Sequence, residues 1–304
     1  MLIIGSIGID QTTFNKDIPK YGEINVGKIV KNPGGKGNNE AIACARAGGE
    51  TLFMGVVGDD FDKYLKQKLE DDNVFPILKV RKGIETHSAS IIIGSDGQSK
   101  IIVNPGEDTY LDINYLNDNI KYIDNAYIVT FQLEIPMKKN EYAIDYCYEK
   151  GKITILNPSP PVELSDNIIK KVTYLILSES ELAVISGMPT KDERQIDSAY
   201  IKIMNRGTRN LIVLLGNKGC ILWNKDEKKE YPSYITDNDA VDYTGNVDCF
   251  IGVFAAYLSK NYELDEAIKY ANLAVSIAVT TVGTISSHSK SGEIDRKREK
   301  IQNW

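Results

Sequence analysis

Short apolar runs alternate with amphipathic stretches along most of the chain, and this alternation constrains the fold more than any other feature. A continuous apolar run is typical of a parallel-sheet strand that is covered on both faces. Such runs are Leu2 to Ile9, Thr51 to Val57, Ala126 to Phe131, Lys152 to Leu156, Thr173 to Leu177 and Asn210 to Leu215. Helical patterns lie between them, for example at Asp59 to Glu70, Met137 to Lys150 and Arg194 to Asn205. Strands separated by helices predict an α/β fold with a mainly parallel central sheet.

One region departs from this alternation and predicts a small second sheet. Residues Ser88 to Gly94 and Ser99 to Asn104 flank an Asp96-Gly97 pair, and Asp-Gly between two strand-like runs is a strong hairpin signal. We expect the extended segment Glu23 to Val30 to join this hairpin in a small antiparallel sheet, a natural lid over a binding cleft. Because no linker or low-complexity tract divides the chain, we expect a single domain over residues 1–304, with the lid from about 12–31 and 85–108.

Composition and charge argue against several classes of partner. The 304 residues include 42 acidic and 36 basic side chains, a net charge of −6, so neither nucleic acid nor an anionic membrane surface is an expected partner. No apolar stretch approaches the ~20 residues that span a bilayer. The N-terminus lacks the basic segment of a signal peptide, and the four cysteines form no CxxC pair. We therefore expect a cytoplasmic protein with reduced thiols.

The first candidate site is the glycine-rich segment Asn32-Pro33-Gly34-Gly35-Lys36-Gly37-Asn38-Asn39-Glu40. Glycines that enter a helix let a polar ligand approach the backbone, and the N-terminus of the helix offers free N–H donors. The spacing fits neither the phosphate-binding GxxxxGK[ST] loop nor the dinucleotide-binding GxGxxG pattern, so a nicotinamide-dependent oxidoreductase is a remote alternative. On these residues alone, a glycine-rich turn with a solvated lysine explains the segment equally well.

The second candidate site is the segment Val241 to Phe250, in which Asp248 precedes a helical pattern of apolar residues. An aspartate near a helix N-terminus commonly serves only as a cap, and the segment alone favours that role. The alternative role is that of a general base, beside backbone N–H groups that stabilise developing negative charge. The chain has only two histidines, His87 and His288, so a Ser-His-Asp triad or a histidine-rich metal site has few candidates.

Taken together and in this order, these segments resemble the ribokinase-like (PfkB) family of sugar kinases. Gly34 to Asn39 is similar to the family's N-terminal signature in the GGKGxN form of ribokinases, and Asp242 to Asp248 is similar to its C-terminal DTxGAGD signature. Four further segments fall where the family has counterparts: Gln132-Leu133-Glu134, Leu156-Asn157-Pro158, Ser178 to Glu181 and Leu215 to Gly219. The resemblance implies a three-layer ribokinase-like fold, with helices flanking the sheet and the hairpin region as the family's β lid.

The resemblance also implies a reaction, the transfer of the γ-phosphate of ATP to a sugar hydroxymethyl group, with ribose as the first substrate to test. Asp248 would take the hydroxyl proton, while Gly245 and the N–H groups after it would hold the phosphoryl oxygens. The implied sugar-binding residues are Asp10, Gly35, Lys36, Asn39 and Glu134, together with Asp248. Carboxylates and amides suit this role because each sugar hydroxyl both donates and accepts hydrogen bonds.

On the nucleotide side, the resemblance implies ATP, Mg²⁺ and a monovalent cation such as K⁺. Glu181 would organise Mg²⁺ through water, since Mg²⁺ keeps much of its hydration. The residues expected beside the nucleotide are Ser178, Gly216, Lys218, Gly219 and Asn272, and those expected around the monovalent cation are Asp242, Thr244 and Ser287. For Asn272 and Ser287, a role as a surface polar residue near a helix end fits at least equally well. A homodimer through the lid is expected, because an open sheet edge benefits from being covered.

The chain departs from the family pattern mainly on the phosphate side. The family's GAGD reads Gly245-Asn246-Val247-Asp248, and a β-branched residue at a position with φ > 0 would cost about 1–3 kcal/mol and crowd the phosphate. Ser178 replaces the asparagine of the NxxE motif, Leu214 replaces a threonine, and Gly8 stands where ribokinases often have asparagine. The alternative is therefore a kinase-fold protein that binds a sugar or nucleoside with weak or no phosphotransfer. Under that alternative, glycine at position 247 would raise activity.

Overall fold

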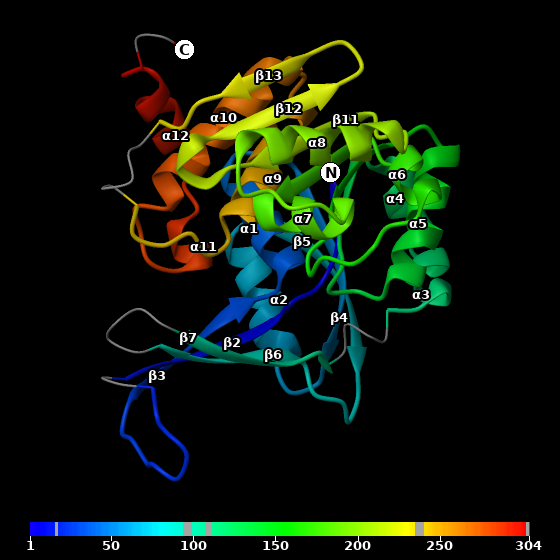
Figure 1. Cartoon of the computed structure of the whole chain (residues 1–304). Helices are drawn as coiled ribbons and strands as arrows, with labels where there is room; N and C mark the ends of the chain where they lie inside the picture. The colour runs from blue at the N-terminus through cyan, green and yellow to red at the C-terminus, as the bar shows by residue number, and fades with distance from the viewer. Residues whose placement is uncertain (16–17, 94–98, 107–110, 235–239, 302–303) are drawn as a thin grey trace.

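The computed structural model describes residues 1–15, 18–93, 99–106, 111–234, 240–301 and 304. Within these residues a nine-stranded sheet forms the centre of the molecule, in the order β13-β12-β11-β10-β9-β8-β1-β4-β5 (Figure 1). Neighbouring strands are parallel from β11 to β5, whereas the β11–β12 and β12–β13 pairs are antiparallel. The strands are β1 (Leu2–Ile4), β4 (Thr51–Gly58), β5 (Val74–Arg81), β8 (Ile128–Gln132), β9 (Ile153–Asn157), β10 (Tyr174–Ser178), β11 (Asn210–Leu214), β12 (Cys220–Asn224) and β13 (Lys228–Tyr231).

Helices cover both faces of this sheet, which confirms the three-layer fold expected from the sequence. Successive strand residues point to opposite faces, so Ile3 packs in one hydrophobic core while Leu2 and Ile4 pack in the other. The first core includes residues of α1 (Lys36–Arg46), α2 (Asp62–Asp71), α9 (Asn246–Ser259), α10 (Leu264–Ala278) and α12 (Ser291–Arg298). The second includes residues of α3 (Ile113–Asp118), α4 (Ile120–Asn125), α5 (Met137–Glu149), α6 (Asp166–Lys171), α7 (Glu179–Ser186) and α8 (Glu193–Asn205).

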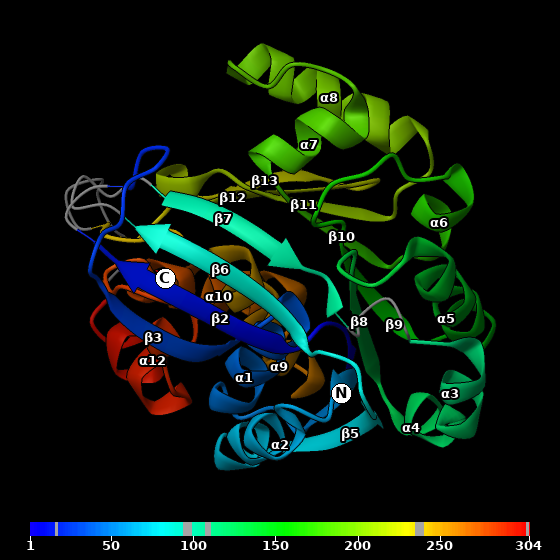
Figure 2. The same ribbon diagram turned by 90° about the horizontal axis from the view of Figure 1, so that it is seen from below.

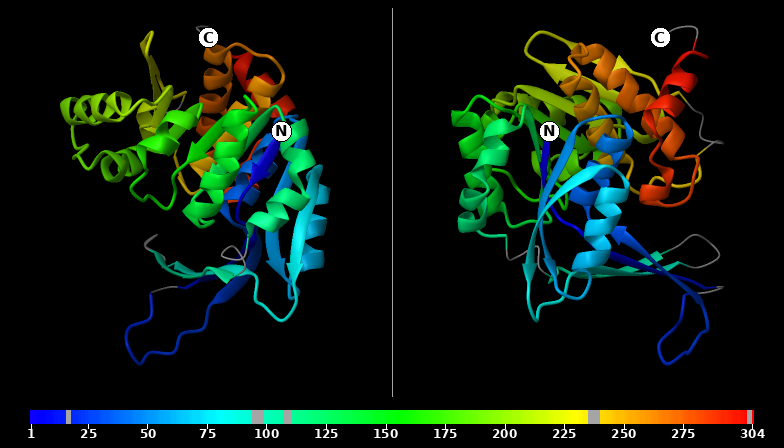
Figure 3. Two further views of the ribbon diagram at one scale, coloured as in Figure 1. Left: turned by 90° about the vertical axis from the view of Figure 1, so that its right-hand side faces the viewer. Right: turned by 180° about the vertical axis from the view of Figure 1, so that it is seen from behind.

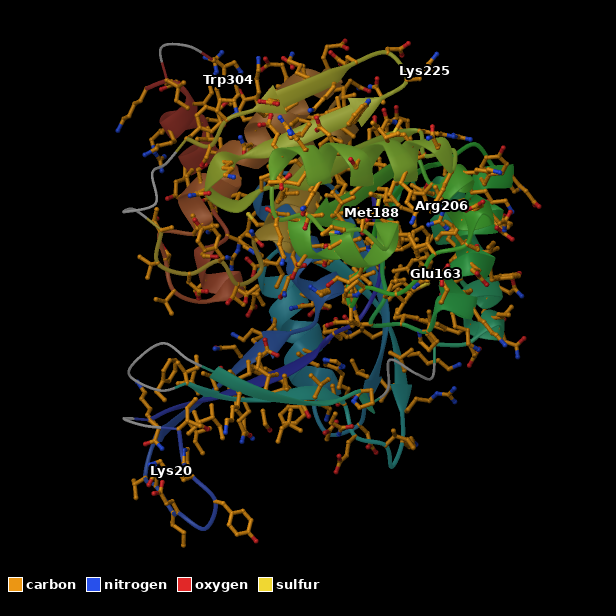
Figure 4. All side chains as sticks on the ribbon, in the orientation of Figure 1. Lys20, Glu163, Met188, Arg206, Lys225 and Trp304 are labelled. Carbon is orange, nitrogen blue, oxygen red and sulfur yellow. The ribbon has the colours of Figure 1, made fainter. Side chains whose placement is uncertain are left out.

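A separate four-stranded sheet, the lid, projects from one end of the main body (Figures 1 and 3). Its order is β3-β2-β6-β7, and in Figure 2 its strands cross in front of α1, α9 and α10. The expected hairpin is present as the antiparallel pair β6–β7, although its turn at 94–98 and the residues at 107–110 lie outside the described residues. Residues 18–27, which lead into β3, extend furthest from the body, as the label on Lys20 shows (Figure 4). The lid strands are β2 (Gly8–Phe14), β3 (Lys28–Gly34), β6 (His87–Ile93) and β7 (Ser99–Asn104).

Two features of the lid differ from the sequence-based expectation. The first apolar run is two strands, because the chain leaves the main sheet after Ile4 and enters the lid at Gly8. The lid therefore begins earlier than residue 12 and extends to Gly34. Its central pair, β2 and β6, is parallel, so the sheet is mixed rather than antiparallel. The pairing joins segments that are almost eighty residues apart, which local sequence patterns do not encode.

The candidate site lies where the carboxyl ends of the parallel strands meet the lid. Strand β1 pairs with β4 on one side and with β8 on the other. The strand order therefore changes direction at β1, since β4 and β5 lie on one side of it and β8 to β13 lie on the other. In open α/β sheets, ligands bind at such a switch point, beyond the carboxyl ends of the strands. Among the described residues, no helix is both long enough and apolar enough to cross a bilayer. The four cysteines are free and buried.

Candidate active site

Three polar side chains from two helices meet at the centre of the site. Helix α1 provides Lys36 and Asn39, and the first turn of α9 provides Asp248. The amide Nδ2 of Asn39 donates a hydrogen bond to Oδ2 of Asp248 over 2.9 Å, and Nζ of Lys36 lies 3.6 Å from Oδ1 of the same carboxylate. Asp248 is buried, and its carboxylate is the main cause of the raised pKa of Lys36. Among the described residues, no hydrogen-bond donor reaches Oδ1 of Asp248. The carboxylate is thus held in place by Asn39, while its Oδ1 can still accept a hydrogen bond.

The glycines around Lys36 are required by close packing. Gly35 has φ +90°, and a Cβ at this position would lie 2.8 Å from the carbonyl oxygen of Ser6. A Cβ at Gly37 would lie 2.7 Å from the Cα of Gly5, so α1 meets the chain leaving β1 at backbone contact. The sequence suggested that these glycines leave backbone open to a ligand. For Gly37 the structure gives a different reason, the docking of the helix against the end of β1.

Glu134, which follows β8, fixes the start of α1. Its Oε2 accepts a hydrogen bond from the backbone N–H of Lys36 over 2.9 Å and another from the hydroxyl of Ser6. Helix α1 begins after Gly35 without a cap from its own N-cap side chain. Glu134, from the segment that follows β8, therefore satisfies one of the free N–H groups at the start of α1. Sequence reasoning gave Glu134 only a sugar contact, and it missed Ser6. The signal for Ser6 was a polar residue at the end of the first apolar run.

Asp10 brings a second carboxylate to the site from the lid. Its side chain leans from β2 over Gly34 of β3, where a Cβ would overlap the carboxylate. Burial raises the pKa of Asp10 to about 6; the charge of His87 lowers it, while the charges of Glu134 and Asp248 raise it further. Asp10 is therefore near enough to sense the carboxylate of Asp248, as the family resemblance implied.

The N-terminus of α9 supplies backbone N–H donors beside Asp248. Gly245 precedes the helix with φ +74°, and a Cβ there would overlap the side chain of Thr284. Val247 lies within the helix without a positive φ, and its side chain is buried in the first core. The backbone strain expected at Val247 is therefore wrong, and the burial of its side chain argues against the expected crowding of phosphate. The N–H of Val247 donates to Oδ1 of Asn246 over 2.8 Å, so one donor of the helix N-terminus is already occupied.

Ser178 and Glu181 form a capping box at the start of α7. The hydroxyl of Ser178 accepts a hydrogen bond from the N–H of Glu181, and Oε2 of Glu181 accepts one from the N–H of Ser178 over 2.7 Å. Nδ2 of Asn157 reaches the same oxygen over 3.3 Å. Serine is thus a well-suited helix cap at this position. Glu181 is buried, and its charge adds to the rise in the pKa of Lys36 that Asp248 causes.

The expected nucleotide loop follows β11 and turns through the short helix η2 (Gly216–Lys218). Gly216 and Gly219 have φ of +60° and +93°, so glycine suits both positions. A Cβ at Gly219 would also lie 2.7 Å from the carbonyl carbon of Pro232. Leu214, which departs from the family pattern, is buried as the last residue of β11. Packing in the core therefore explains the leucine at position 214.

Asn272 of α10 is buried at the expected position, and its amide already has protein partners. Nδ2 donates hydrogen bonds to the carbonyl oxygens of Tyr231 and Pro232, over 3.3 and 2.7 Å. These bonds tie α10 to the segment that follows β13. The contact of Asn272 with a nucleotide stays a prediction.

The residues expected around a monovalent cation lie on two adjoining segments. Oδ1 of Asp242 accepts a hydrogen bond from the N–H of Thr244 over 2.9 Å, and Oδ2 accepts one from the N–H of Gly283 over 2.8 Å. Burial raises the pKa of Asp242, but these hydrogen bonds outweigh it and the pKa is lowered overall. The hydroxyl of Ser287 donates to the carbonyl oxygen of Thr284 within α11 (Thr284–Ser287) over 2.6 Å. No three His, Cys, Asp or Glu side chains of the described ranges are grouped to hold a metal ion by themselves.

Sequence reasoning also missed two buried ionisable groups near Asp248. Glu40 of α1 is buried and accepts hydrogen bonds from Thr130 and Gln132 of β8 over 2.7 and 2.5 Å. Burial raises its pKa well above the usual value, which favours the neutral acid. His288 is buried too, and burial lowers its pKa to about 4, so its imidazole is neutral at neutral pH. The available sequence signal for Glu40 was its spacing of four residues from Lys36, which places both side chains on the same face of a helix.

Comparison with known proteins identifies the family. The family described as pfkB family carbohydrate kinase matches residues 1–291. The chain belongs to this family. It is therefore a phosphotransferase that uses ATP and acts on a sugar hydroxyl, which confirms the activity expected from the resemblance.

Individual members of the PfkB family are similar over nearly their whole length. A deoxyribokinase from Salmonella typhi is 30% identical over 291 residues, 94% of each chain. A ribokinase from Mus musculus is 27% identical over 296 residues, which are 95% of this chain and 91% of that protein. The structure of Arabidopsis thaliana ribokinase complexed with ribose and ATP has a TM-score of 0.90 at 26% identity, covering 99% of this chain and 98% of that one.

Proposed function

We propose that the protein phosphorylates the hydroxymethyl group of ribose or a closely related pentose, with Asp248 as the general base. The observation that carries this proposal is the state of the Asp248 carboxylate. Asn39 fixes its Oδ2, Lys36 lies beside Oδ1, and no other described residue donates a hydrogen bond to Oδ1. A buried acceptor that is held in place and left unsatisfied suits a hydroxyl of the substrate. The ribokinases and deoxyribokinase among the relatives support a pentose as the acceptor.

In the proposed reaction, Oδ1 of Asp248 takes the proton of the sugar hydroxyl. The hydroxyl oxygen then forms a bond to the γ-phosphorus as the bond to the bridging β,γ-oxygen breaks, which gives a sugar phosphate and ADP. Positioning and charge stabilisation supply most of the catalysis in such a transfer. The protonated Lys36 and the N-terminus of α9, which begins after Gly245, place positive charge around the phosphoryl group. Asp10, Asn39 and Glu134 hold the sugar, with Gly35 at the start of α1.

Two metal ions fit the donors that the chain offers. Glu181 has one carboxylate oxygen held by Ser178 and Asn157, and the other suits a Mg²⁺ ion held through water beside the ATP phosphates. When bound, Mg²⁺ neutralises part of the phosphate charge. Asp242, Thr244 and Ser287 offer the oxygen ligands that a monovalent cation such as K⁺ prefers, so we include K⁺ in the proposal. Ser178, Gly216, Lys218, Gly219 and Asn272 remain the proposed contacts of the nucleotide.

A sugar- or nucleoside-binding protein with weak phosphotransfer is the second candidate, and one observation favours it. Oδ1 of Asn246 already accepts a hydrogen bond from the N–H of Val247, one of the donors expected to hold phosphate. An incoming phosphoryl oxygen has to displace this side chain. The loss of one such donor can lower a rate by about 10²–10³. Val247 and Leu214 no longer support this candidate, because both are buried in the core.

The experiment that tests the proposal is ADP release from Mg²⁺-ATP in the presence of K⁺, across ribose, 2-deoxyribose, other pentoses, hexoses and nucleosides. We expect turnover with a pentose and a loss of about 10²–10⁴ in kcat for Asp248→Asn, which removes the base but keeps the side-chain volume. Asp145→Asn is a matched control, since Asp145 lies on α5 and pairs with Lys171 on the surface. Full activity of Asp248→Asn would exclude the assigned base. Equal, vanishing activity of the wild type with every acceptor would favour the binding protein.

We also propose a homodimer that forms through the lid. The lid exposes apolar side chains on its sheet and on the loop between β2 and β3, and large exposed apolar patches are unusual in monomers. The exposed residues are Phe14, Tyr21, Ile24, Val26, Ile29, Ile101, Ile102 and Val103. A second copy of the chain is the occupant that the open edges β3 and β7 favour.

A further inference from the structure

Two polar side chains lean over a pair of glycines at the root of the lid. Gly8 of β2 pairs with Gly34 of β3 on one side and with His87 of β6 on the other. A Cβ at Gly34 would overlap the carboxylate of Asp10, and a Cβ at Gly8 would lie 2.6 Å from Cδ2 of His87. Neither glycine has space for a side chain, because Asp10 and His87 occupy that space.

His87 shares the site of Asp10 and Asp248. The charge of His87 lowers the pKa of Asp10, and the charges of Glu134 and Asp248 raise it, so all three groups lie within electrostatic range of Asp10. His87 is only 6% exposed. A hydrogen bond from a side chain in such a shielded position is stronger than one in water.

The position of His87 is fixed by the main domain. The preceding residue, Thr86, accepts a hydrogen bond at Oγ1 from the N–H of Gly58 over 3.0 Å, and its own N–H donates to Oδ1 of Asp60 over 3.1 Å. Gly106 packs on the backbone of His87, where a Cβ would lie 2.6 Å from its Cα. Strand β6 thus begins at an anchored point, and anchored elements position ligand-binding side chains more precisely than free loops do.

A buried histidine is often explained by packing alone, but two observations favour a ligand contact here. His87 pairs with Gly8, two residues before Asp10 on the neighbouring strand, and its charge acts on the Asp10 carboxylate that the family resemblance assigns to the sugar. Its Cδ2 also lies 2.6 Å from the point where a Cβ at Gly8 would stand, so the ring, together with the carbonyl oxygen of His87, occupies the space beside Gly8. A neutral imidazole has both a hydrogen-bond donor and an acceptor.

We propose that His87 is a sugar-binding residue that, together with Asp10, brackets one ring hydroxyl of the acceptor sugar. The imidazole N–H donates to the hydroxyl oxygen, and the hydroxyl donates to the Asp10 carboxylate. This inference rests on the proposed function for the identity of the ligand as a pentose. A site that binds a hydroxyl in this way rejects the analogue that lacks it, because its own polar groups are left unpaired.

Equilibrium binding tests the proposal without requiring phosphotransfer. Ribose, 2-deoxyribose and 3-deoxyribose are titrated by calorimetry into the wild type, His87→Phe, which keeps a ring but has no nitrogen, and His87→Asn, which keeps a donor and an acceptor. We expect the wild type to bind one deoxy sugar at least about tenfold more weakly than ribose. His87→Phe is expected to weaken ribose binding by about tenfold or more and to lose the discrimination, which His87→Asn partly restores. Ser88→Ala is the matched control, since Ser88 is the next residue of β6 and points to the other face of the lid.

A second measurement applies to the unaltered protein and covers a failure of His87→Phe to fold. The chain has only two histidines, so the imidazole resonances of His87 and the buried His288 are readily assigned by NMR. We expect ribose to shift the His87 resonances, and the same shift to be absent in His87→Asn and His87→Phe, which identifies the signals of His87.

The possible outcomes separate this inference from the proposed function. Unchanged ribose affinity and discrimination in His87→Phe, or a His87 resonance that ribose leaves in place, would overturn the inference while kinase activity persists. Binding that depends on His87 in a wild type that releases no ADP would support the inference and refute the kinase. Absence of binding by all three sugars would overturn the inference directly.

Discussion

At the residue scale, Asp10 is the group whose charge is expected to control sugar binding. Burial raises its pKa to about 6, so near that pH the free protein holds a mixture of carboxylate and acid. The carboxylate accepts hydrogen bonds from sugar hydroxyls, whereas the acid has lost an acceptor. We expect kcat/KM for the sugar to fall by about tenfold per pH unit below about pH 6, because this ratio reports ionisation of the free enzyme. Steady-state kinetics from about pH 5 to about pH 8 with saturating ATP measure this profile.

Two variants assign the inflection to Asp10. Asp10→Asn is expected to remove it along with much of the affinity for the sugar. His87→Gln is expected to move it to higher pH, because the charge of His87 lowers the pKa of Asp10, while Glu134 and Asp248 remain to raise it. An inflection near pH 6 that persists in Asp10→Asn would show that another group is responsible.

Individual site residues could be predicted only where a motif names them. Lys36, Asn39 and Asp248 came from the two signatures, and the structure brings all three together. His87 carries no local signal, because its nearness to Asp10 depends on the parallel pairing of β2 with β6. The role of Gly37 likewise depends on the contact of α1 with Gly5 at the end of β1, which is a property of the fold.

At the scale of a single element, the N-terminus of α9 separates two explanations of the altered GAGD motif. Val247 is helical and packs in the core, so Val247→Gly is expected to lower the free energy of unfolding by about 2 kcal/mol without raising the rate. Asn246→Ala releases the N–H of Val247 and is expected to raise kcat/KM for ATP by about fivefold, the value of about one net hydrogen bond. Urea denaturation and steady-state kinetics with varied ATP measure the two effects.

The reverse results have distinct meanings. A rate gain in Val247→Gly would show that the side chain restricts the phosphate site after all. A rate loss in Asn246→Ala would show that the Asn246 amide serves the phosphoryl group when ATP is bound.

Helix α9 itself was predictable, because Phe250, Ile251, Phe254, Ala255 and Leu258 have helical spacing, and α9 spans Asn246–Ser259. The conformation of Val247 at its start was not, since it depends on which side of the first turn meets the core.

At the scale of the whole molecule, the sequence predicts the three layers but not the boundary between sheet and lid. Strand and helix periods are local, so the alternation of elements gives the parallel sheet. The division of Leu2 to Ile9 between β1 and β2 is set by contacts with strands far away in the chain. The same holds for the exposed apolar residues of the lid, because their sequence pattern is that of ordinary strand residues and does not show which of them stay uncovered.

The exposed apolar residues of the lid lead to a prediction about assembly. Ile101 and Ile102 of β7 are 58% and 74% exposed on opposite faces of the lid, beside an open edge. We expect the wild type to sediment as a dimer at micromolar concentration and the double variant Ile101→Lys/Ile102→Lys as a monomer, because burial of either lysine without a partner opposes association. Ile201→Lys is the matched control: Ile201 is 50% exposed on α8, far from the lid in Figure 1, and should leave the dimer intact. A monomeric wild type would exclude the dimer, and a dimeric double variant would place the interface away from these two side chains.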